Sequence, residues 1–273
     1  MSQEGYVNRY DWITGNNYTI RPIQQDPNVK LRFNWNSAIN IDPNNNNTIF
    51  FGSQFVHKSN DKGQTWAIIS PDLTTNDSDK LNQSESGGLT MDATGAENYC
   101  SILVIEPSKI EEDLIWVGTD DGQVHLTKNG GNNWIDVTGN VRGLPNGSWI
   151  TQIKASNKNK GEALLVANDY RRFNYEAYVF KTINYGKTWK RIVSDKDVKS
   201  YALCIVEDNL EPNLIFLGTD DGLYVSIDAG DNWTKWTNGF PTVPVKDLLI
   251  HPRESDLVIG TFGRAAWIID DIE

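Results

Sequence analysis

The sequence predicts an all-β protein, a β-propeller built from four-stranded antiparallel blades. A phrase with the pattern Ser/Thr-x-Asp/Asn-x-Gly-x-Thr/Asn-Trp occurs four times, ending at Trp66, Trp134, Trp189 and Trp233. Short apolar runs bounded by polar turns lie between these phrases, and no segment keeps helical periodicity over the length of a helix. Four-stranded units that recur about every 40–50 residues indicate a propeller.

Each repeated unit is expected to contain four short strands in the same order. A nearly unchanged run occurs at 113–122 and again at 213–222, and both copies end in Gly-Thr-Asp-Asp-Gly. We interpret this run as a second strand and its turn, preceded by a first strand, as at 102–107, and followed by a third. The phrase then links the third strand to a fourth strand, which begins at its Trp.

The strand count predicts about five blades in a single domain that spans residues 1–273. Complete blades are expected within 36–70, 99–138, 149–193 and 200–237. Residues 245–271 supply three strands, and the N-terminal hairpin at 6–23 is expected to pair with this last blade, which would cover exposed strand edges. The alternative is an open arc, a fragment of a larger propeller that further sequence or another chain completes.

The phrase itself is interpreted as a structural turn. Its Asp or Asn accepts backbone hydrogen bonds within the turn, its Ser or Thr bonds across the turn, its Gly permits a positive φ, and its Trp buries a large ring between blades. Two of the four copies carry Asn in place of Asp, which a turn tolerates and a charged catalytic or metal-binding role does not. The residues assigned this role are Ser59, Asp61, Gly63, Trp66, Thr127, Asn129, Gly131, Trp134, Thr182, Asn184, Gly186, Trp189, Ser226, Asp228, Gly230 and Trp233.

The phrase resembles the Asp-box, or bacterial neuraminidase repeat (BNR), of sialidases, xyloglucan-active hydrolases, photosystem assembly propellers and sortilin/Vps10-type receptors. The whole chain is similar to bacterial sortilin/Vps10-like proteins labelled BNR-repeat glycosyl hydrolases. The stretches that carry this likeness are 8–15, 20–22, 33–37, 69–74, 118–122, 218–222 and 263–271. The resemblance implies that the phrase lies on the rim, away from the ligand, and that such a stretch forms the latter part of a longer propeller region.

Candidate ligand contacts are expected on the face that carries the loops between strands 2 and 3 and the loops that join blades, because function concentrates in loops on a rigid scaffold. The long polar insertion at 71–100 and the segment 169–176, which departs from the repeat, are expected there as well. Acidic pairs, arginines and aromatic rings together suit a sugar platform, an acid/base pair, a Ca²⁺ site or a peptide groove, whereas each Asp-Asp-Gly is also explained by a hairpin turn alone. The candidates are Tyr99, Asp120, Asp121, Trp149, Asn168, Asp169, Arg171, Arg172, Asp220, Asp221 and Arg264.

Three functions fit these observations. The favoured one is a non-catalytic binding module for a peptide, a protein or a glycan, which is what the sortilin-like resemblance implies. A glycoside hydrolase of the xyloglucanase type, with two catalytic carboxylates, is an alternative; because that family places them in a cleft between two propellers, no catalytic residue is assigned here. A structural or assembly segment of a larger propeller is the third.

Composition narrows the class of partner. The net charge of −11 argues against nucleic acid and against an anionic membrane surface, and no apolar run is long enough to span a membrane. Cys100 and Cys204 are expected to be buried free thiols, and no cofactor or metal site is expected from the spacing of the histidines and cysteines. No signal peptide is visible, so we expect a cytoplasmic protein as the chain stands, or a secreted or periplasmic one if it is a fragment.

Overall fold

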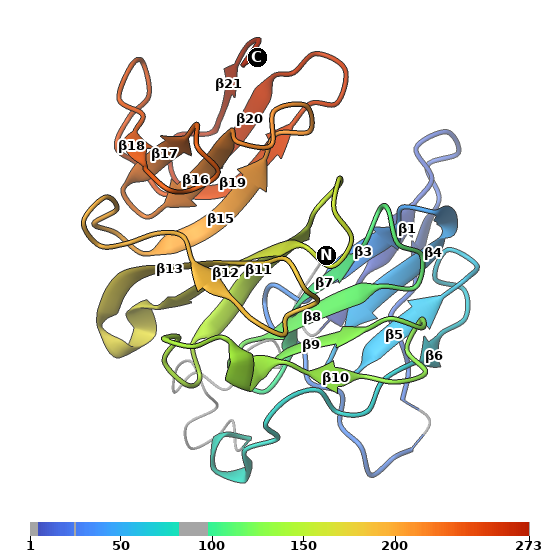
Figure 1. The fold of residues 1–273 in the computed structure, drawn as a ribbon. Helices are drawn as coiled ribbons and strands as arrows, with labels where there is room; N and C mark the ends of the chain where they lie inside the picture. Colours follow the sequence, from blue (N-terminus) through green and yellow to red (C-terminus); the bar gives the residue numbers. More distant parts are fainter. Residues whose placement is uncertain (1–4, 25, 82–97, 273) are drawn as a thin grey trace. The chain divides into compact units, whose positions relative to one another are not determined.

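The computed structural model describes residues 5–24, 26–81 and 98–272, and these form small antiparallel sheets joined by turns. Short 3₁₀ turns occur, and the described residues contain no α-helix. The chain divides into two compact units, Met1–Gly139 and Asn140–Glu273. Figure 1 shows the strands of both units in sequence colours, and each unit is described here by itself.

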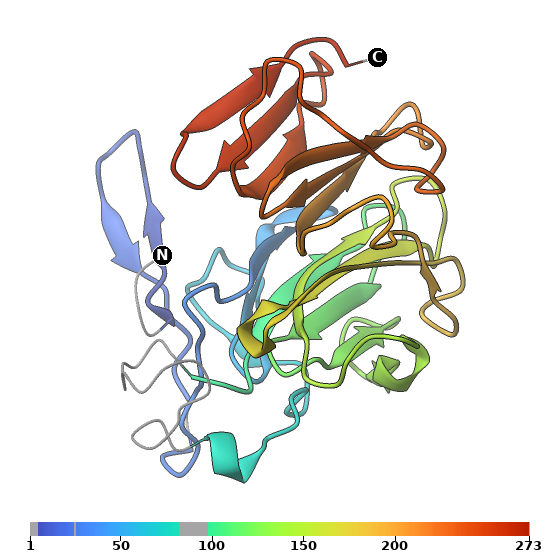
Figure 2. The ribbon, with the colours of Figure 1, turned by 90° about the vertical axis from the view of Figure 1, so that its left-hand side faces the viewer.

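The first unit contains a hairpin and two four-stranded sheets. The hairpin, shown in blue in Figure 2, comprises β1 (Asn8–Tyr10) and β2 (Asn17–Thr19). The first sheet comprises β3 (Ile39–Asp42), β4 (Asn45–Gly52), β5 (Val56–Ser59) and β6 (Ala67–Ile68), and the second comprises β7 (Ile102–Pro107), β8 (Ile115–Thr119), β9 (Val124–Thr127) and β10 (Ile135–Asp136).

Two apolar clusters hold this unit together. Phe50 and Val56 of the first sheet pack with Ile102 and Val117 of the second. On the other side, Ile20 beside the hairpin packs with the buried ring of Phe51. The hairpin therefore takes the place of a preceding sheet against the first four-stranded sheet, because it covers the face that the second sheet does not.

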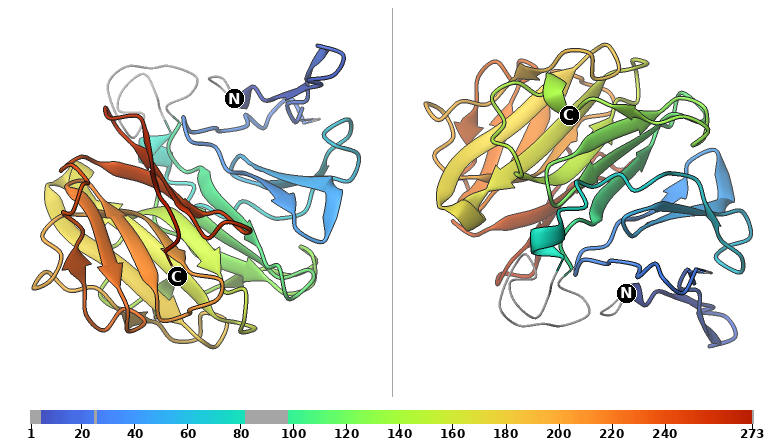
Figure 3. Two further views of the ribbon diagram at one scale, coloured as in Figure 1. Left: turned by 90° about the horizontal axis from the view of Figure 1, so that it is seen from above. Right: turned by 90° about the horizontal axis from the view of Figure 1, so that it is seen from below.

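The second unit contains two four-stranded sheets and one three-stranded sheet, arranged side by side (Figure 3). The first comprises β11 (Trp149–Ala155), β12 (Ala163–Asp169), β13 (Asn174–Thr182) and β14 (Lys190–Arg191). The second comprises β15 (Ala202–Glu207), β16 (Ile215–Thr219), β17 (Gly222–Ser226) and β18 (Thr234–Lys235). The third comprises β19 (Val245–Ile250), β20 (Leu257–Thr261) and β21 (Ala266–Ile269).

Each repeated phrase forms the turn between the third and fourth strands of a sheet. In the first copy the Ser59 hydroxyl accepts from the Gly63 N–H at 2.7 Å and donates to the Asp61 carboxylate at 2.7 Å, and the carboxylate accepts from the Thr65 N–H at 2.8 Å. The Asn184 copy keeps the same pattern through its side-chain oxygen, which accepts from the Thr188 N–H at 3.0 Å. The exchange of Asp for Asn therefore preserves the turn.

The residue before the glycine of each phrase also has a left-handed backbone, which the sequence analysis did not foresee. Lys62, Tyr185 and Ala229 each have φ of 59°, and the second phrase has a glycine, Gly130, with φ of 66° at this position. Two consecutive left-handed residues turn the chain back so that the Trp can pack on the preceding element. A residue with a side chain is sterically disfavoured at these positions, whereas glycine is not, because it has no Cβ.

The indole of three phrases donates its Nε1–H to a carbonyl of an earlier element. Trp134 bonds to the Ile69 carbonyl at 2.8 Å, directly after β6, and Trp233 bonds to the Ile192 carbonyl at 2.9 Å, directly after β14. Trp66 bonds in the same way to Ile20, directly after β2, at 2.7 Å. The hairpin strand β2 thus occupies the position of a fourth strand.

These observations confirm the all-β fold of small antiparallel sheets. The number of blades, the single domain over 1–273 and the pairing of the hairpin 6–23 with the blade 245–271 stay predictions, and the last of these would join the two units. Residues 82–97 of the predicted polar insertion lie outside the described residues.

A candidate ligand-binding surface in the second unit

The connection between β12 and β13 departs from the tight turns of the other sheets in the second unit. Residues Tyr170–Arg172 form a 3₁₀ turn, and Phe173 ends it in the left-handed region, with φ of 61° and its N–H bonded to the Tyr170 carbonyl at 3.0 Å. A bulky residue is rarely left-handed, and such strain gathers at functional sites. The Phe173 ring is 85% exposed, so the turn presents an aromatic side chain to solvent.

Flat side chains stack beside this turn. The Arg171 guanidinium carbon lies 3.3 Å from the ring centroid of Trp149 and 4.4 Å from that of Tyr170. The Tyr170 ring stacks in turn on Tyr201, with centroids 4.6 Å apart and an interplanar angle of 23°. Tyr175 adds a tilted ring at 6.2 Å from Tyr201. Residues from three places in the sequence therefore meet: the start of β11, the β12–β13 connection with the start of β13, and the residue before β15.

Acidic side chains lie at the edge of this stack, and each is already bonded. The Tyr201 hydroxyl donates to the Asp220 carboxylate at 2.8 Å, and burial raises the pKa of Tyr201. Asp169 accepts from the Arg172 Nε–H at 2.5 Å and more weakly from Asn174 at 3.3 Å. These carboxylates fix the loops and hold the tyrosine and the arginine in place.

The structure brings together only some of the predicted residues. Trp149, Asp169, Arg171, Arg172 and Asp220 belong to this stack or its edge. Asp221 instead accepts from Lys235 at 2.9 Å and from the Thr219 hydroxyl at 2.7 Å, which anchors the β16–β17 turn to β18.

Two further predicted residues of the second unit have other surroundings. Arg264 is exposed in the β20–β21 turn, where its carbonyl accepts from the Trp267 indole at 3.0 Å. Asn168 is 1% exposed, its amide donates to the Ala202 carbonyl at 3.4 Å, and its side-chain oxygen has no hydrogen-bond partner. Because Asn168 is paired with Trp149 across β11 and β12, this unsatisfied oxygen belongs to a residue beside the stack.

The predicted residues of the first unit are buried. Asp120 is fully buried and accepts from the Ser101 N–H at 2.8 Å, the Ser101 hydroxyl at 2.7 Å and the Asn34 amide at 3.1 Å. Asp121 is 2% exposed and accepts from the Thr75 N–H and hydroxyl, both at 2.7 Å. Tyr99 is 7% exposed, and Lys80 lies over its ring. Their burial argues against direct ligand contact.

Sequence reasoning missed the tyrosines that make the stack continuous. Tyr170 and Tyr175 lie within the segment 169–176 that it singled out, whereas Tyr201 lies in the loop before β15 and was not named. One signal could have found it. Tyr201 stands directly before its strand, as Ser101 stands directly before β7, and each bonds to the first Asp of a Gly-Thr-Asp-Asp-Gly copy.

Two carboxyl groups among the described residues have a raised pKa. Burial and then the neighbouring charge of Asp121 raise the pKa of Asp120 to about 7, but Asp120 has no exposed surface, and burial also raises the pKa of Glu207. A Ser53–His57 contact of 2.8 Å is also buried, and desolvation lowers the pKa of His57 to about 4. The described residues hold no group of three or more His, Cys, Asp or Glu placed to bind a metal.

Within the residues that the structure describes, no helix has the length and apolar character needed to cross a membrane. Comparison with protein families gives no match, and neither does comparison with curated proteins.

Solved structures, in contrast, are similar over most of the chain. The xyloglucanase of glycoside hydrolase family GH74 from Xanthomonas campestris matches at a TM-score of 0.63 and 18% identity, over 86% of this chain and 36% of the enzyme. The extracellular domain of a hybrid two-component system from B. thetaiotaomicron matches at a TM-score of 0.62 and 15% identity, over 98% of this chain and 31% of that chain. YCF48 from Cyanidioschyzon merolae matches at a TM-score of 0.54 and 14% identity, over 89% of this chain and 68% of that chain.

The chain thus spans about a third of the length of the xyloglucanase and of the two-component-system domain. At these identities the likeness concerns the fold alone. Together with the small antiparallel sheets, it shows that the chain has a fold of the β-propeller type.

Proposed function

We propose that this chain is a non-catalytic binding propeller of the Asp-box type, and that it takes its ligand on the stack in the second unit. The four-stranded sheets are then blades, and the repeated turns are Asp-box turns that join their third and fourth strands. The surface comprises Trp149, Tyr170, Arg171, Phe173, Tyr175, Tyr201 and Asp220.

One observation carries this proposal: Trp149, Arg171, Tyr170 and Tyr201 form a stack that ends at the exposed ring of Tyr175, beside a turn that exposes Phe173. Trp149 and Tyr201 are 7% and 9% exposed and form the inner part, whereas Phe173 and Tyr175 are 85% and 55% exposed. Exposed aromatic rings supported by ordered neighbours lose little conformational entropy when a ligand covers them, so they suit recognition.

The ligand class that fits best is a glycan. The apolar faces of sugar rings can cover exposed aromatic rings, and Arg172 and Glu176 provide exposed charged groups that can bond sugar hydroxyls beside Phe173 and Tyr175. The similarity to a xyloglucanase supports this choice, because that enzyme shares the fold. A peptide ligand is the outcome that the same experiment would distinguish.

Catalysis at this surface is not favoured, because hydrolysis of a glycosidic bond requires two carboxyl groups on either side of it. The nearby carboxylates of Asp169 and Asp220 are held by Arg172 and Tyr201. The share of the xyloglucanase that the chain covers does favour a second candidate, in which this chain is the binding part of a longer propeller protein.

The test is a binding screen with xyloglucan oligosaccharides, other neutral glycans and a peptide library, with release of reducing sugar measured in parallel. The variants Phe173→Ala and Tyr175→Ala are expected to weaken binding of the best glycan about 10-fold each, since stacked aromatic contacts contribute on the order of 1 kcal/mol or more. Phe262→Ala removes a ring that is 70% exposed in the β20–β21 turn and serves as the matched control.

Three results would overturn the proposal or part of it. If Phe262→Ala and Phe173→Ala weakened glycan binding equally, the ligand would not bind at the assigned surface. Tight binding of peptides without any glycan binding would mean that the ligand is a peptide and not a glycan. Turnover of an oligosaccharide by the unaltered chain would make it an enzyme.

A further inference from the structure

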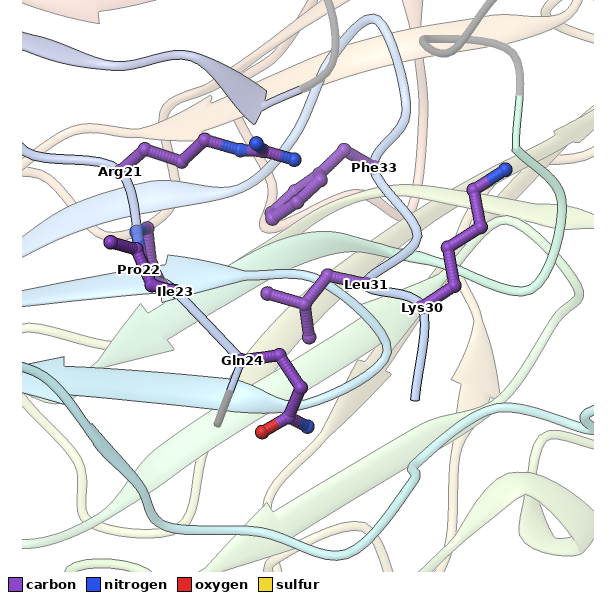
Figure 4. Close-up of a pocket in the computed structure, with 7 residues that line it drawn as sticks. All are labelled: Arg21, Pro22, Ile23, Gln24, Lys30, Leu31 and Phe33. Carbon is purple, nitrogen blue, oxygen red and sulfur yellow. The ribbon is translucent and has the colours of Figure 1, made fainter. Parts of the chain in front are cut away.

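A cavity in the first unit shares no residue with the stack and is not used by the proposed function. It has a volume of about 320 Å³ and is lined by Arg21, Pro22, Ile23, Gln24, Lys30, Leu31 and Phe33. Figure 4 shows two arms of the N-terminal segment facing each other, with Arg21 to Gln24 on one and Lys30 to Phe33 on the other. This volume lies at the lower end of the range for small-molecule sites.

Both arms are fixed to the body of the unit, so the cavity is preformed. The first arm follows Ile20, whose N–H bonds to the Val7 carbonyl at 2.9 Å and whose carbonyl accepts the Trp66 indole. The second arm is held by Gln54, which is 1% exposed and bonds to the Lys30 carbonyl at 3.0 Å and to the Arg32 N–H at 2.9 Å. A preformed site binds without the cost of ordering its walls.

The charge of the cavity is opposite to that of the molecule. Of the described residues that line it, two are basic and none is acidic, in a chain with a net charge of −11. The ion pairs of the described residues do not include Arg21, and its Nε is buried without a hydrogen-bond partner. The nearby Asp26 carboxylate already accepts hydrogen bonds from Asn28, at 2.9 Å from its backbone N–H and at 3.1 Å from its side-chain amide.

The position of the guanidinium is fixed by aromatic rings rather than by an anion. Its carbon lies 4.7 Å from the ring centroid of Tyr6 and 5.2 Å from that of Phe33. In Figure 4 the Arg21 side chain extends toward the Phe33 ring. Ring contacts hold the plane of the group but leave its charge uncompensated, and a guanidinium matches a carboxylate through paired N–H donors.

Apart from Gln24 and the two basic residues, the lining is apolar. Phe33 and Leu31 are 1% and 9% exposed and belong to the core of the unit, and Pro22 is buried beside them. Ile23 is 87% exposed at the rim, where a bound apolar group would cover it. An inorganic anion would pair with the Arg21 guanidinium but would leave this apolar surface exposed to water.

We propose that this cavity binds a small organic acid, in which a single carboxylate pairs with Arg21 and a branched aliphatic or aromatic body covers Ile23 at the rim and meets Leu31. The site is independent of the surface in the second unit.

The test compares three probes by isothermal titration calorimetry at low salt: N-acetyl-L-leucine, its neutral amide N-acetyl-L-leucinamide, and inorganic phosphate. The acid is expected to bind at least about 10-fold more tightly than the amide, because a charge-assisted hydrogen bond contributes more than about 1.4 kcal/mol. Equal binding of acid and amide would overturn the role of Arg21, and phosphate that binds as tightly as the acid would overturn the role of the apolar lining.

Three variants assign the binding to this cavity. Arg21→Gln is expected to reduce affinity for N-acetyl-L-leucine about 10-fold or more. Ile23→Asp places a negative charge at an exposed position outside the core and is expected to abolish binding while the melting temperature stays unchanged. Arg253→Gln removes an exposed arginine of the second unit and serves as the matched control. Unchanged affinity in a folded Ile23→Asp variant would exclude this cavity as the site.

Discussion

The two copies of Gly-Thr-Asp-Asp-Gly have the same five residues and different surroundings. In both, the first Asp bonds to the residue that precedes a first strand: Asp120 to Ser101, and Asp220 to Tyr201. The backbone link is also shared, because each Asp N–H bonds to the carbonyl of that same residue, at 3.0 and 3.2 Å. Yet Asp120 is completely buried, whereas Asp220 is partly exposed.

The length of the hydroxyl-bearing side chain accounts for this difference. Serine is short, so the Asp120 carboxylate reaches inward to it and is enclosed by Asn34 as well. Tyrosine is long, so its hydroxyl meets Asp220 farther from the backbone, while its ring is free to stack on Tyr170. One residue outside the motif thus separates a structural anchor from the edge of a candidate binding surface.

The largest difference between the copies is expected on removal of the carboxylate. Asp120→Ala should lower the free energy of unfolding by about 3 kcal/mol or more, because three buried donors from Ser101 and Asn34 lose their acceptor. Asp220→Ala should cost about 1 kcal/mol, because one donor, the Tyr201 hydroxyl, loses its acceptor. Chemical denaturation of both variants measures this, and equal costs would mean that burial does not distinguish the two copies.

The copies should also differ in how stability depends on pH. The pKa of Asp120 is raised from 3.8 to about 7 in the folded state, mainly by burial, so the folded protein binds a proton that the unfolded chain releases. This contribution is fully present below the unfolded pKa and is lost as pH rises toward and through about 7. Asp120→Asn should therefore flatten the fall in melting temperature between about pH 4 and 8. Asp220→Asn is the control, and an unchanged slope in Asp120→Asn would contradict the prediction.

A shared backbone requirement should give nearly equal effects. Gly122 and Gly222 follow the two Asp pairs with φ of 87° and 139°, and both lie in the region that side chains disfavour. Alanine at either position should lower the free energy of unfolding by about 1–2 kcal/mol. A large difference measured by thermal denaturation would show that the two turns differ in more than the use of their carboxylates.

The smallest effect is expected for the tyrosine hydroxyl. Tyr201→Phe removes the bond to Asp220 and keeps the stack, so it should cost about 1 kcal/mol of stability and leave glycan affinity nearly unchanged. Affinity that falls as far as in Phe173→Ala would instead place the hydroxyl or Asp220 in direct contact with the ligand. Calorimetry on the same glycan separates these outcomes.

Much of the fold follows from local sequence. The strands end where apolar runs meet Gly, Asp or Pro, and the four phrases locate the turns between third and fourth strands because each carries its own hydrogen-bond acceptors. The left-handed Lys62, Tyr185 and Ala229 could not be foreseen from their types, because none favours that backbone. The role of β2 as a fourth strand could not be foreseen either, because it depends on the bond from Trp66, far along the chain.

The candidate site was harder to predict than the fold. The segment 169–176 attracted attention by its composition, but the Asp pairs looked alike in the sequence although their burial differs. The decisive partners, Ser101 and Tyr201, lie about 20 residues away in other loops, and their effect depends on side-chain length in three dimensions. The cavity at Arg21 left no sequence signal at all, because it arises from two arms folding against each other.

The bonds from Trp66, Trp134 and Trp233 all point backward along the chain. Each of these three sheets bonds to a carbonyl on an element that is synthesised before it, so its assembly can follow synthesis without waiting for later segments. The hairpin precedes the first four-stranded sheet and offers the template for it. Deleting it should therefore slow the maturation of the nascent chain more than an equally large deletion at the C-terminus.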